Sequence, residues 1–314
     1  MHKVILDTDI GTDVDDLLAL TFLLNSPEIE LLGVTAAYGN TLVRGKLAYR
    51  TLSLAGREDI PVTLGDSQTL LHNRNIFWPG HEGKNAKVEE IPDTVLSKQS
   101  AVDFILGTIR KHPGEIILCT VAPLTNIAQA IIRDPETMSK VKHIVMMGGV
   151  FGFEDVTLSL PVSEHNFRCD PEATRVVFNS DLPITLFPLD VTLKTPFMRE
   201  DLEQLRTSQT PLLSLVVQEI ETWLEVIKKL AGRDYCHLHD PLAAASIVDP
   251  GIVTHKVETS LKIECQGELT SGLSMADHSR QANVQVVTGI DLSRFYELFM
   301  GRMKQPSTLQ TAMK

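Results

Sequence analysis

Five aspartates stand within ten residues near the start of the chain. They are Asp7, Asp9, Asp13, Asp15 and Asp16. Capping and the helix dipole favour one or two carboxylates in the first turn of a helix. Five carboxylates this close repel one another, and a hard divalent cation with oxygen ligands is the simplest agent that holds them together. The spacing therefore predicts an acidic metal site rather than a purely structural turn.

The acidic turn lies between two apolar segments that would position it. Residues 4–6 form a short apolar run typical of a buried strand, and the leucines from Leu17 onward have the spacing of a helix. Further along, short apolar runs alternate with helical patterns. The expected strands are residues 30–37, 60–64, 115–119, 143–147 and 182–186, and the expected helices are residues 42–55, 100–111, 123–133 and 171–178.

This alternation predicts an α/β fold with a Rossmann-like, mostly parallel sheet flanked by helices. Ligands of such sheets bind beyond the carboxyl ends of the strands. The acidic turn follows an expected strand, and so do Asn40, Val121 and the glycines at 148–149. We therefore expect these segments to meet at one edge of the sheet.

The last third of the chain does not continue the regular alternation of strands and helices. Residues 198–230 predict two helices, with Trp223 as a packing residue, and Asp240 stands where the N-cap of another helix would lie. Alternating segments within residues 252–287 predict a small antiparallel piece, and residues 293–303 predict a closing helix. We expect these segments to form a small antiparallel and helical extension at the C-terminus.

Length and composition limit the classes of function. The chain has 314 residues, 43% of them hydrophobic, which is ample material for a core. A prior of about 150 residues per domain would suggest two domains, but large α/β proteins often form one. No repeat or linker forces a boundary, so we expect one domain over residues 1–314. The net charge of −11 argues against a nucleic-acid partner, which usually needs a basic face.

We expect a cytoplasmic protein without a membrane partner. A strand begins at residue 3, which leaves no room for a secretory signal, and no apolar run approaches the roughly 20 residues of a membrane span. The cysteines show no Cys-x-x-Cys spacing, which favours reduced thiols over a zinc site. They are Cys119, Cys169, Cys236 and Cys265.

Four stretches occur in the order found in the inosine–uridine preferring nucleoside hydrolases. They are the acidic turn, residues 121–128 (VAPLTNIA), residues 163–173 (SEHNFRCDPEA) and residues 239–241 (HDP), with residues 38–40 (YGN) and 147–149 (MGG) between them. The chain resembles this family from its first strand to its final helix. The resemblance implies hydrolysis of the N-glycosidic bond of purine or pyrimidine ribonucleosides, which gives free base and ribose. It also implies one calcium ion per subunit and a homo-oligomer, either a dimer or a tetramer.

The resemblance implies a role for each metal-site residue. Asp9, Asp16 and Asp240 match the carboxylate ligands, and Val121 matches a backbone carbonyl ligand, which makes an apolar side chain acceptable there. Such a set suits calcium, which takes about six to eight oxygen ligands. Asp9 also matches the general base that takes a proton from the metal-held water.

Other matched positions would bind the sugar. Asp15 and Asn40 match ribose-contacting residues, and Glu164 and Asn166 match groups that hold the sugar hydroxyls. The transition state of glycosidic cleavage resembles an oxocarbenium ion, with positive charge on the ribose. Carboxylates around the sugar would stabilise that charge.

Histidines are candidates for the leaving-group acid. His239 matches the family histidine that protonates the departing base, and a histidine can supply a proton near neutral pH. The alternative is a hydrogen-bonded structural histidine, but the neighbouring Asp240 favours the acid. His81 lies in the long aperiodic segment 71–91, roughly where the family carries a histidine over the base. The sequence favours neither a contact between His81 and the base nor the lack of one. His237 fits a structural or peripheral role.

The chain departs from the family pattern in three places, one of which is the segment 84–87 (KNAK), which lacks the further glycines often seen there. Residues 12–14 lengthen the first motif, so Asp13 is an extra carboxylate without an assigned role, and a different placement of the gap would exchange Asp13 for Asp15. His165 stands where an aromatic residue is often found beside the ribose. These departures leave the preferred base open.

Two other classes of protein compete with a nucleoside hydrolase. A haloacid-dehalogenase-type phosphatase also begins with a strand and an Asp-x-Asp pair, and Asp7 would then be a nucleophile with magnesium as cofactor. That reading does not explain His239 and Asp240. A non-catalytic calcium- or nucleoside-binding protein would keep the ligands and lose the base or the acid, yet Asp9 and His239 are both present.

Overall fold

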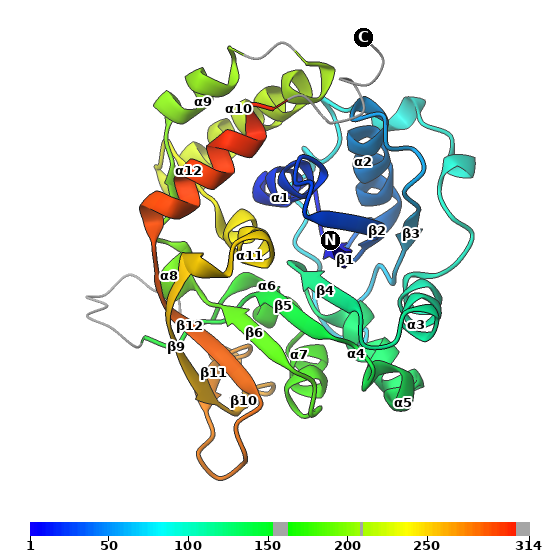
Figure 1. Cartoon of the computed structure of the whole chain (residues 1–314), viewed down its shortest axis with the longest axis vertical. Helices are drawn as coiled ribbons and strands as arrows, with labels where there is room; N and C mark the ends of the chain where they lie inside the picture. The colour runs from blue at the N-terminus through cyan, green and yellow to red at the C-terminus, as the bar shows by residue number, and fades with distance from the viewer. Residues whose placement is uncertain (153–162, 208–209, 306–314) are drawn as a thin grey trace.

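The strand that precedes the acidic turn, β1 (His2–Thr8), lies inside an eight-stranded sheet (Figure 1). The computed structural model describes residues 1–152, 163–207 and 210–305. The other strands of this sheet are β2 (Ile29–Ala36), β3 (Val62–Leu64), β4 (Ile116–Thr120), β5 (His143–Met147), β6 (Ile184–Phe187), β9 (Val253–Thr259) and β12 (Val284–Ile290). Their order is β3-β2-β1-β4-β5-β6-β12-β9. All neighbours run parallel except β9, which pairs antiparallel with β12, so the predicted mostly parallel sheet is confirmed.

Both faces of the sheet are covered, because successive side chains of a strand point to opposite faces. Val4 and Leu6 belong to one apolar core, and Ile5 belongs to the other. The first core is closed by α1 (Asp15–Leu24), α2 (Thr41–Leu54), α8 (Leu189–Thr192), α9 (Arg199–Leu205), α10 (Pro211–Ala231), α11 (His239–Val248) and α12 (Leu292–Met303). The second is closed by α3 (Ala101–Lys111), α4 (Thr125–Arg133), α5 (Pro135–Met138), α6 (His165–Cys169) and α7 (Pro171–Phe178).

The parallel order brings the carboxyl ends of β1, β4 and β5 to one edge of the sheet. The acidic turn follows β1, Val121 follows β4, and Gly148 follows β5. Helix α11 packs along α1, as Figure 1 shows. This packing places Asp240, in the first turn of α11, beside the aspartates at the start of α1, although more than two hundred residues separate them in the chain.

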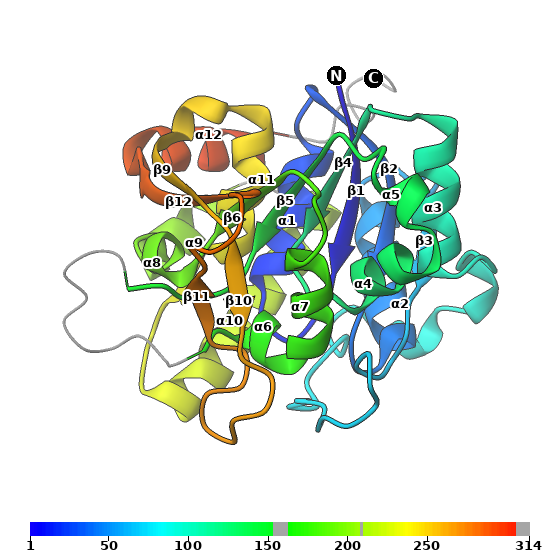
Figure 2. The same cartoon turned by 90° about the horizontal axis from the view of Figure 1, so that it is seen from below.

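The C-terminal third is only partly separate from the main sheet. The two helices expected within residues 198–230 are present as α9 and α10. A small antiparallel pair, β10 (Leu261–Ile263) with β11 (Ser274–Ala276), lies beside α7 (Figure 2). Strands β9 and β12, however, extend the main sheet. A second short pair joins β7 (Pro196–Phe197) to β8 (Cys236–His237).

The expected N-cap at Asp240 is wrong. Helix α11 begins at His239, with Leu238 at the N-cap, because the backbone N–H of Leu238 is tied to the Thr195 carbonyl at 2.9 Å as the chain leaves β8. The Asp240 carboxylate therefore makes no capping hydrogen bond and is left for another partner.

Within the described part of the chain, no helix is both long and apolar enough to cross a membrane. The long segment 71–91 contains one short 3₁₀ turn, η1 (Val88–Glu90), and a second, η2 (Asp93–Val95), follows it.

Candidate active site

A cavity of about 560 Å³ opens at the carboxyl edge of the sheet, within the size range of small-molecule sites. Eight of the ten predicted site residues line it. They are Asp9, Asp15, Asp16, Val121, Glu164, Asn166, His239 and Asp240. The other two, Asn40 and His81, lie outside the lining. The fold thus brings together residues from four distant segments of the chain.

Hydrogen bonds to the buried Asp7 anchor the turn that carries the aspartates. Asp7 is fully buried and accepts hydrogen bonds from Thr35 at 2.5 Å, Asn126 at 2.8 Å and Thr120 at 3.4 Å. Burial raises the pKa of Asp7 to about 6. Gly11 has a φ of +119°, a conformation that side-chain-bearing residues rarely adopt. Asp7 therefore holds the end of β1 and does not face the cavity, which argues against its use as a phosphatase nucleophile.

Three carboxylates form the tightest acidic group. Oxygen atoms of Asp15, Asp16 and Asp240 all lie within 4.8 Å of one another. Burial, together with the neighbouring carboxylates, raises the pKa of each well above its usual value. The Thr8 hydroxyl donates to Asp16, and the backbone N–H of Asp240 donates to Asp15 at 3.3 Å. Buried oxygen donors with so little compensating charge fit a hard divalent cation.

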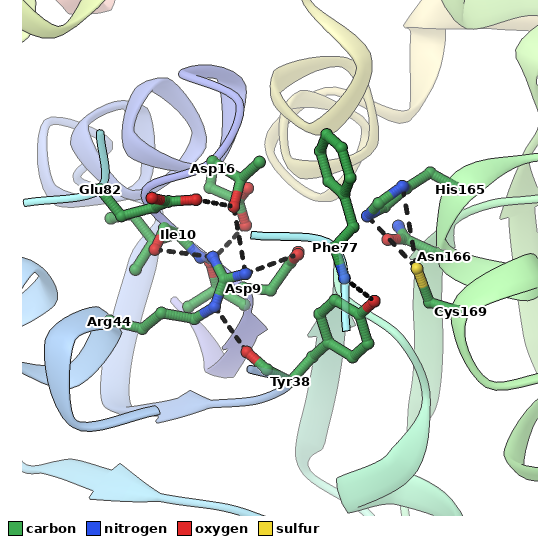
Figure 3. A network of polar contacts seen from close by, with 12 residues as sticks. Asp9, Ile10, Asp16, Tyr38, Arg44, Phe77, Glu82, His165, Asn166 and Cys169 are labelled. Carbon is green, nitrogen blue, oxygen red and sulfur yellow. Dashed lines mark hydrogen bonds and ion pairs between the residues drawn. The ribbon is translucent and has the colours of Figure 1, made fainter. Parts of the chain in front are cut away.

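Asp9 lies outside this tight group and has a different partner. Its carboxylate is 3.6 Å from the guanidinium of Arg44, whose side chain is fully buried (Figure 3). Arg44 also donates to the carbonyl oxygens of Tyr38 at 2.6 Å and Ile10 at 3.1 Å, and it lies over the Trp78 ring. Arg44 could not be identified from the sequence, which shows only a basic residue near the start of a partly apolar helix.

Asp13, the carboxylate without an assigned role, also lines the cavity. It is half-buried, and its carboxylate accepts a hydrogen bond from the backbone N–H of Val14 at 2.6 Å. Burial raises its pKa to about 7. Asp13 and Asp9 therefore join the three aspartates of the tight group, so that five aspartates line the cavity.

Glu164 and Asn166 form the wall opposite the acidic turn. Glu164 caps α6 by accepting from the backbone N–H groups of Asn166 at 2.7 Å and Phe167 at 3.1 Å, and it also accepts from Gly149 at 3.0 Å. Burial nevertheless raises its pKa to about 7. The Asn166 amide donates to the Val121 carbonyl at 2.9 Å. That carbonyl keeps a second lone pair for another partner.

His239 sits at the start of α11, half-buried. Its Nδ1 lies 2.8 Å from the Thr192 hydroxyl, and its ring centroid is 5.2 Å from that of His237. Burial, together with the nearby His237 and Arg233, lowers the pKa of His239 to about 3. The ring is therefore neutral at pH 7, and one ring nitrogen still carries a hydrogen that it can donate.

The two predicted residues outside the cavity have local partners. Asn40 is exposed, and its side chain caps α2 by accepting from the Val43 N–H at 3.2 Å. His81 Nε2 lies 2.8 Å from the Thr12 carbonyl, and its ring stacks on Trp223 with the centroids 5.9 Å apart. Trp223, expected to pack, is buried and also lines the cavity.

Further residues line the cavity besides the predicted site residues. His165 lines the cavity with its ring edge-on to Tyr38 and Phe77, at centroid distances of 6.2 and 5.8 Å (Figure 3). The remaining apolar and basic lining residues are Met147, Leu189, Leu193, Ile227, Leu230, Arg168 and Arg233. The cavity lining thus combines acidic, apolar and basic side chains.

Comparisons with known proteins agree with this site. A family model described as inosine-uridine preferring nucleoside hydrolase matches residues 4–297. An uncharacterised protein of Schizosaccharomyces pombe is 36% identical over 320 residues, which cover 96% of this chain and 98% of that protein. A pyrimidine-specific ribonucleoside hydrolase, RihA, of Escherichia coli O1:K1 / APEC is 31% identical over 310 residues, which cover 96% of this chain and 98% of that protein.

A solved structure leads to the same family. The purine-preferring ribonucleoside hydrolase from Gardnerella vaginalis superposes with a TM-score of 0.85 and 31% identity, covering 98% of this chain and 99% of that chain. The resemblance carried by the four sequence motifs is confirmed, and so is the α/β fold. The chain belongs to the inosine-uridine preferring nucleoside hydrolase family and is a ribonucleoside hydrolase.

Proposed function

We propose that the protein hydrolyses the N-glycosidic bond of purine or pyrimidine ribonucleosides in a calcium-dependent reaction that releases base and ribose. The observation that carries this proposal is the convergence of the aspartates of α1, Asp240 of α11 and His239 on one cavity. The relatives are named for different bases, one pyrimidine-specific and one purine-preferring, so membership of the family does not choose between the two classes.

The metal would be held by Asp9, Asp16, Asp240 and the carbonyl oxygen of Val121, with Asp15 close enough to contribute. All of these donors are oxygens on the cavity lining, which favours calcium over softer metals. A bound calcium ion supplies positive charge that orients ribose hydroxyls and lowers the pKa of a water molecule.

Asp9 is the proposed general base. A carboxylate can take the proton of an attacking water whose pKa is lowered. The ion pair with Arg44 limits the positions open to the Asp9 side chain, and it balances one negative charge of the acidic turn. The water oxygen then forms a bond to the anomeric carbon of ribose as the bond to the base breaks.

The sugar would lie between the acidic turn and α6. Asp15 on one side and Glu164 and Asn166 on the other line the cavity, and each can accept or donate to a hydroxyl. The negative charge of the Asp15 and Glu164 carboxylates would stabilise the oxocarbenium-like transition state. A contact of Asn40 or His81 with the substrate stays a prediction.

His239 is the proposed partner of the leaving base. The electron pair of the broken bond leaves with the base nitrogen, which must gain a hydrogen bond or a proton. Because the ring is neutral without substrate, His239 meets the base as a hydrogen-bond donor, with Thr192 setting its orientation through Nδ1.

A nucleoside panel tests this function. Release of free ribose from inosine, guanosine, adenosine, uridine and cytidine is measured by a reducing-sugar assay, with calcium and with a chelator. We expect release that the chelator abolishes and calcium restores. A phosphatase would act only on phosphate esters, and a binding protein would release no ribose from any nucleoside, so either outcome would contradict the proposal.

A further inference from the structure

A second, much smaller cavity lies between the acidic turn and α10. Its volume is about 10 Å³, close to the roughly 10–15 Å³ that one water molecule needs. Its lining includes His81 from the segment 71–91 and Glu219 from α10. The Nδ1 atom of His81 and the Oε1 atom of Glu219 are both buried, and neither has a hydrogen-bond partner among the described residues. Two such atoms at one small cavity require a bound group that satisfies both.

Both unpartnered atoms are hydrogen-bond acceptors. His81 Nε2 lies 2.8 Å from the carbonyl oxygen of Thr12, which can only accept, so Nε2 carries the hydrogen of the neutral ring and Nδ1 keeps a lone pair. The Oε1 atom of an ionised Glu219 is an acceptor as well. Within the part of the chain that the structure describes, no hydrogen bond joins these two atoms directly. The group between them must therefore donate two hydrogen bonds, as a water molecule can.

Glu219 is a buried carboxylate with little compensation from the protein. It is only 7% exposed, and its other oxygen, Oε2, accepts from the Asn85 amide at 3.3 Å. Burial raises the pKa of Glu219 to about 7, and the hydrogen bond from Asn85 opposes part of that rise. A water molecule at Oε1 would offset part of the cost of burying the carboxylate. It can also accept from the carboxyl group when Glu219 is protonated, so the bridge forms in both states.

The residues around the small cavity connect the acidic turn to α10. On one side, the Thr12 hydroxyl of the acidic turn donates to Glu82 at 3.2 Å. On the other side, the Asn85 amide donates to the Thr222 hydroxyl of α10 at 2.7 Å. Residues 80–85 are thus attached to the acidic turn at one end and to α10 at the other, with the small cavity between the two attachments.

We propose that one buried water molecule donates hydrogen bonds to His81 Nδ1 and Glu219 Oε1, and that Glu219 thereby holds residues 80–85 against α10. Glu219 does not line the active-site cavity and is not part of the tight acidic group. It acts through His81 on Thr12 and Trp223, which both line the active-site cavity. Glu219 is therefore a positioning residue for one wall of that cavity.

Hydrogen exchange tests the bridge on the protein without substrate. Glu219→Met keeps the length of the side chain and removes both carboxylate oxygens. We expect the backbone amides of residues 79–88 to exchange about 5- to 100-fold faster in this variant, the range for leaving a buried acceptor unsatisfied. Glu219→Gln should stay within about twofold of the wild type, because its amide can accept from Asn85 and donate to the water molecule, which still donates to His81. Unchanged exchange in Glu219→Met would overturn the proposal.

Glu225→Met is the matched control. Glu225 also lies on α10, is exposed and lines neither cavity. The substitution makes the same change of side chain and charge, so residues 79–88 should exchange at wild-type rates in this variant. Faster exchange of these residues in Glu225→Met, or equally faster exchange of the central strands β1, β4 and β5 in Glu219→Met, would show a general loss of stability and overturn the local role of Glu219.

A crystal structure locates the bridging group directly. We expect one water molecule within about 3.2 Å of both His81 Nδ1 and Glu219 Oε1 in the wild-type chain, and none at that position in Glu219→Met. A direct hydrogen bond between the two side chains would overturn the water site. A cation at the roughly 2.0–2.6 Å that is typical of metal–oxygen bonds would overturn it as well.

Kinetics test the positioning role, and this measurement alone rests on the proposed hydrolysis. With inosine, Glu219→Met should raise KM by about 3- to 10-fold and change kcat by less than about threefold, because the displaced wall contacts the substrate without taking part in bond cleavage. Glu219→Gln should recover most of the loss. An unchanged KM in Glu219→Met would overturn the positioning of the cavity wall. Absence of ribose release by the wild-type enzyme would instead contradict the proposed function, and the exchange and crystal results would still decide the bridge.

Discussion

Arg44 forms an ion pair at 3.6 Å with Asp9, which lines the cavity, and the arginine side chain is completely buried. The guanidinium also binds the carbonyls of Tyr38 and Ile10, so it ties the turn after β2 to the turn after β1. The proposed base is thus positioned by a residue of α2 that itself does not line the cavity. This linkage makes Arg44 a positioning residue.

Arg44→Met should therefore damage both stability and catalysis. Removal of one partner of a buried ion pair costs about 3–5 kcal/mol, because the remaining polar groups lose their partner. We expect a lower urea midpoint and a fall in kcat with a smaller change in KM. Arg44→Lys should recover part of the stability, since it restores the charge. An Arg44→Met enzyme with unchanged kcat would show that the pair has no positioning role.

The location of the site could be predicted from local sequence, because the acidic turn, Val121 and the glycines after β5 all follow parallel strands. Arg44 could not be predicted, because its partners belong to turns that only the folded sheet brings together.

Two side chains each fit two local roles. Asn40 is expected at the ribose, and its side chain also caps α2, a use that an asparagine directly before a helix indicates. The ribose contact of Asn40 stays a prediction. Asp240 is expected to be a cap, yet α11 begins two residues earlier than that cap would require, with Leu238 at the N-cap.

Asp9→Asn should abolish most turnover and leave the fold intact. The amide has the shape of the carboxylate but cannot take the proton of water, and general-base catalysis is worth about 10²- to 10⁴-fold. Single-turnover rates with inosine and the circular dichroism spectrum measure the two properties. Asp13→Asn, which removes a neighbouring carboxylate of the same turn, should cost less than about tenfold. A larger loss in Asp13→Asn than in Asp9→Asn would reassign the base.

Without the metal, the free energy of unfolding should fall as pH rises. Burial raises the pKa of Asp7 to about 6 and that of Asp13 and Glu164 to about 7, and burial with the neighbouring carboxylates raises the pKa of each residue of the tight acidic group well above its usual value. Between about pH 4 and pH 7 the folded chain without metal therefore binds more protons than the unfolded chain. Its stability then decreases through this window, so Tm in chelator should be lower at pH 8 than at pH 6.

Calcium should reverse this trend, because it binds the ionised carboxylates that proton loss exposes. At a concentration one hundred times its Kd it would add about 2.7 kcal/mol. Scanning calorimetry at pH 6 and pH 8 measures the shift, and Asp16→Asn should reduce it. A Tm that calcium and chelator leave equal at both pH values would contradict a metal site at the aspartates.

His239→Ala should slow substrates according to their leaving group. Without the ring, a nucleoside base departs with no hydrogen-bond donor at its nitrogen, so kcat/KM for inosine should fall about 10²-fold, while p-nitrophenyl riboside should lose only a few-fold. Because the pKa of His239 is lowered to about 3, the pH profile of the wild-type enzyme should show no ionisation of this ring between pH 5 and pH 8. His237→Ala, which changes a neighbouring ring outside the cavity lining, is the control and should not separate the two substrates. Equal losses on inosine and p-nitrophenyl riboside in His239→Ala would mean that the histidine orients the site and does not assist the departing base.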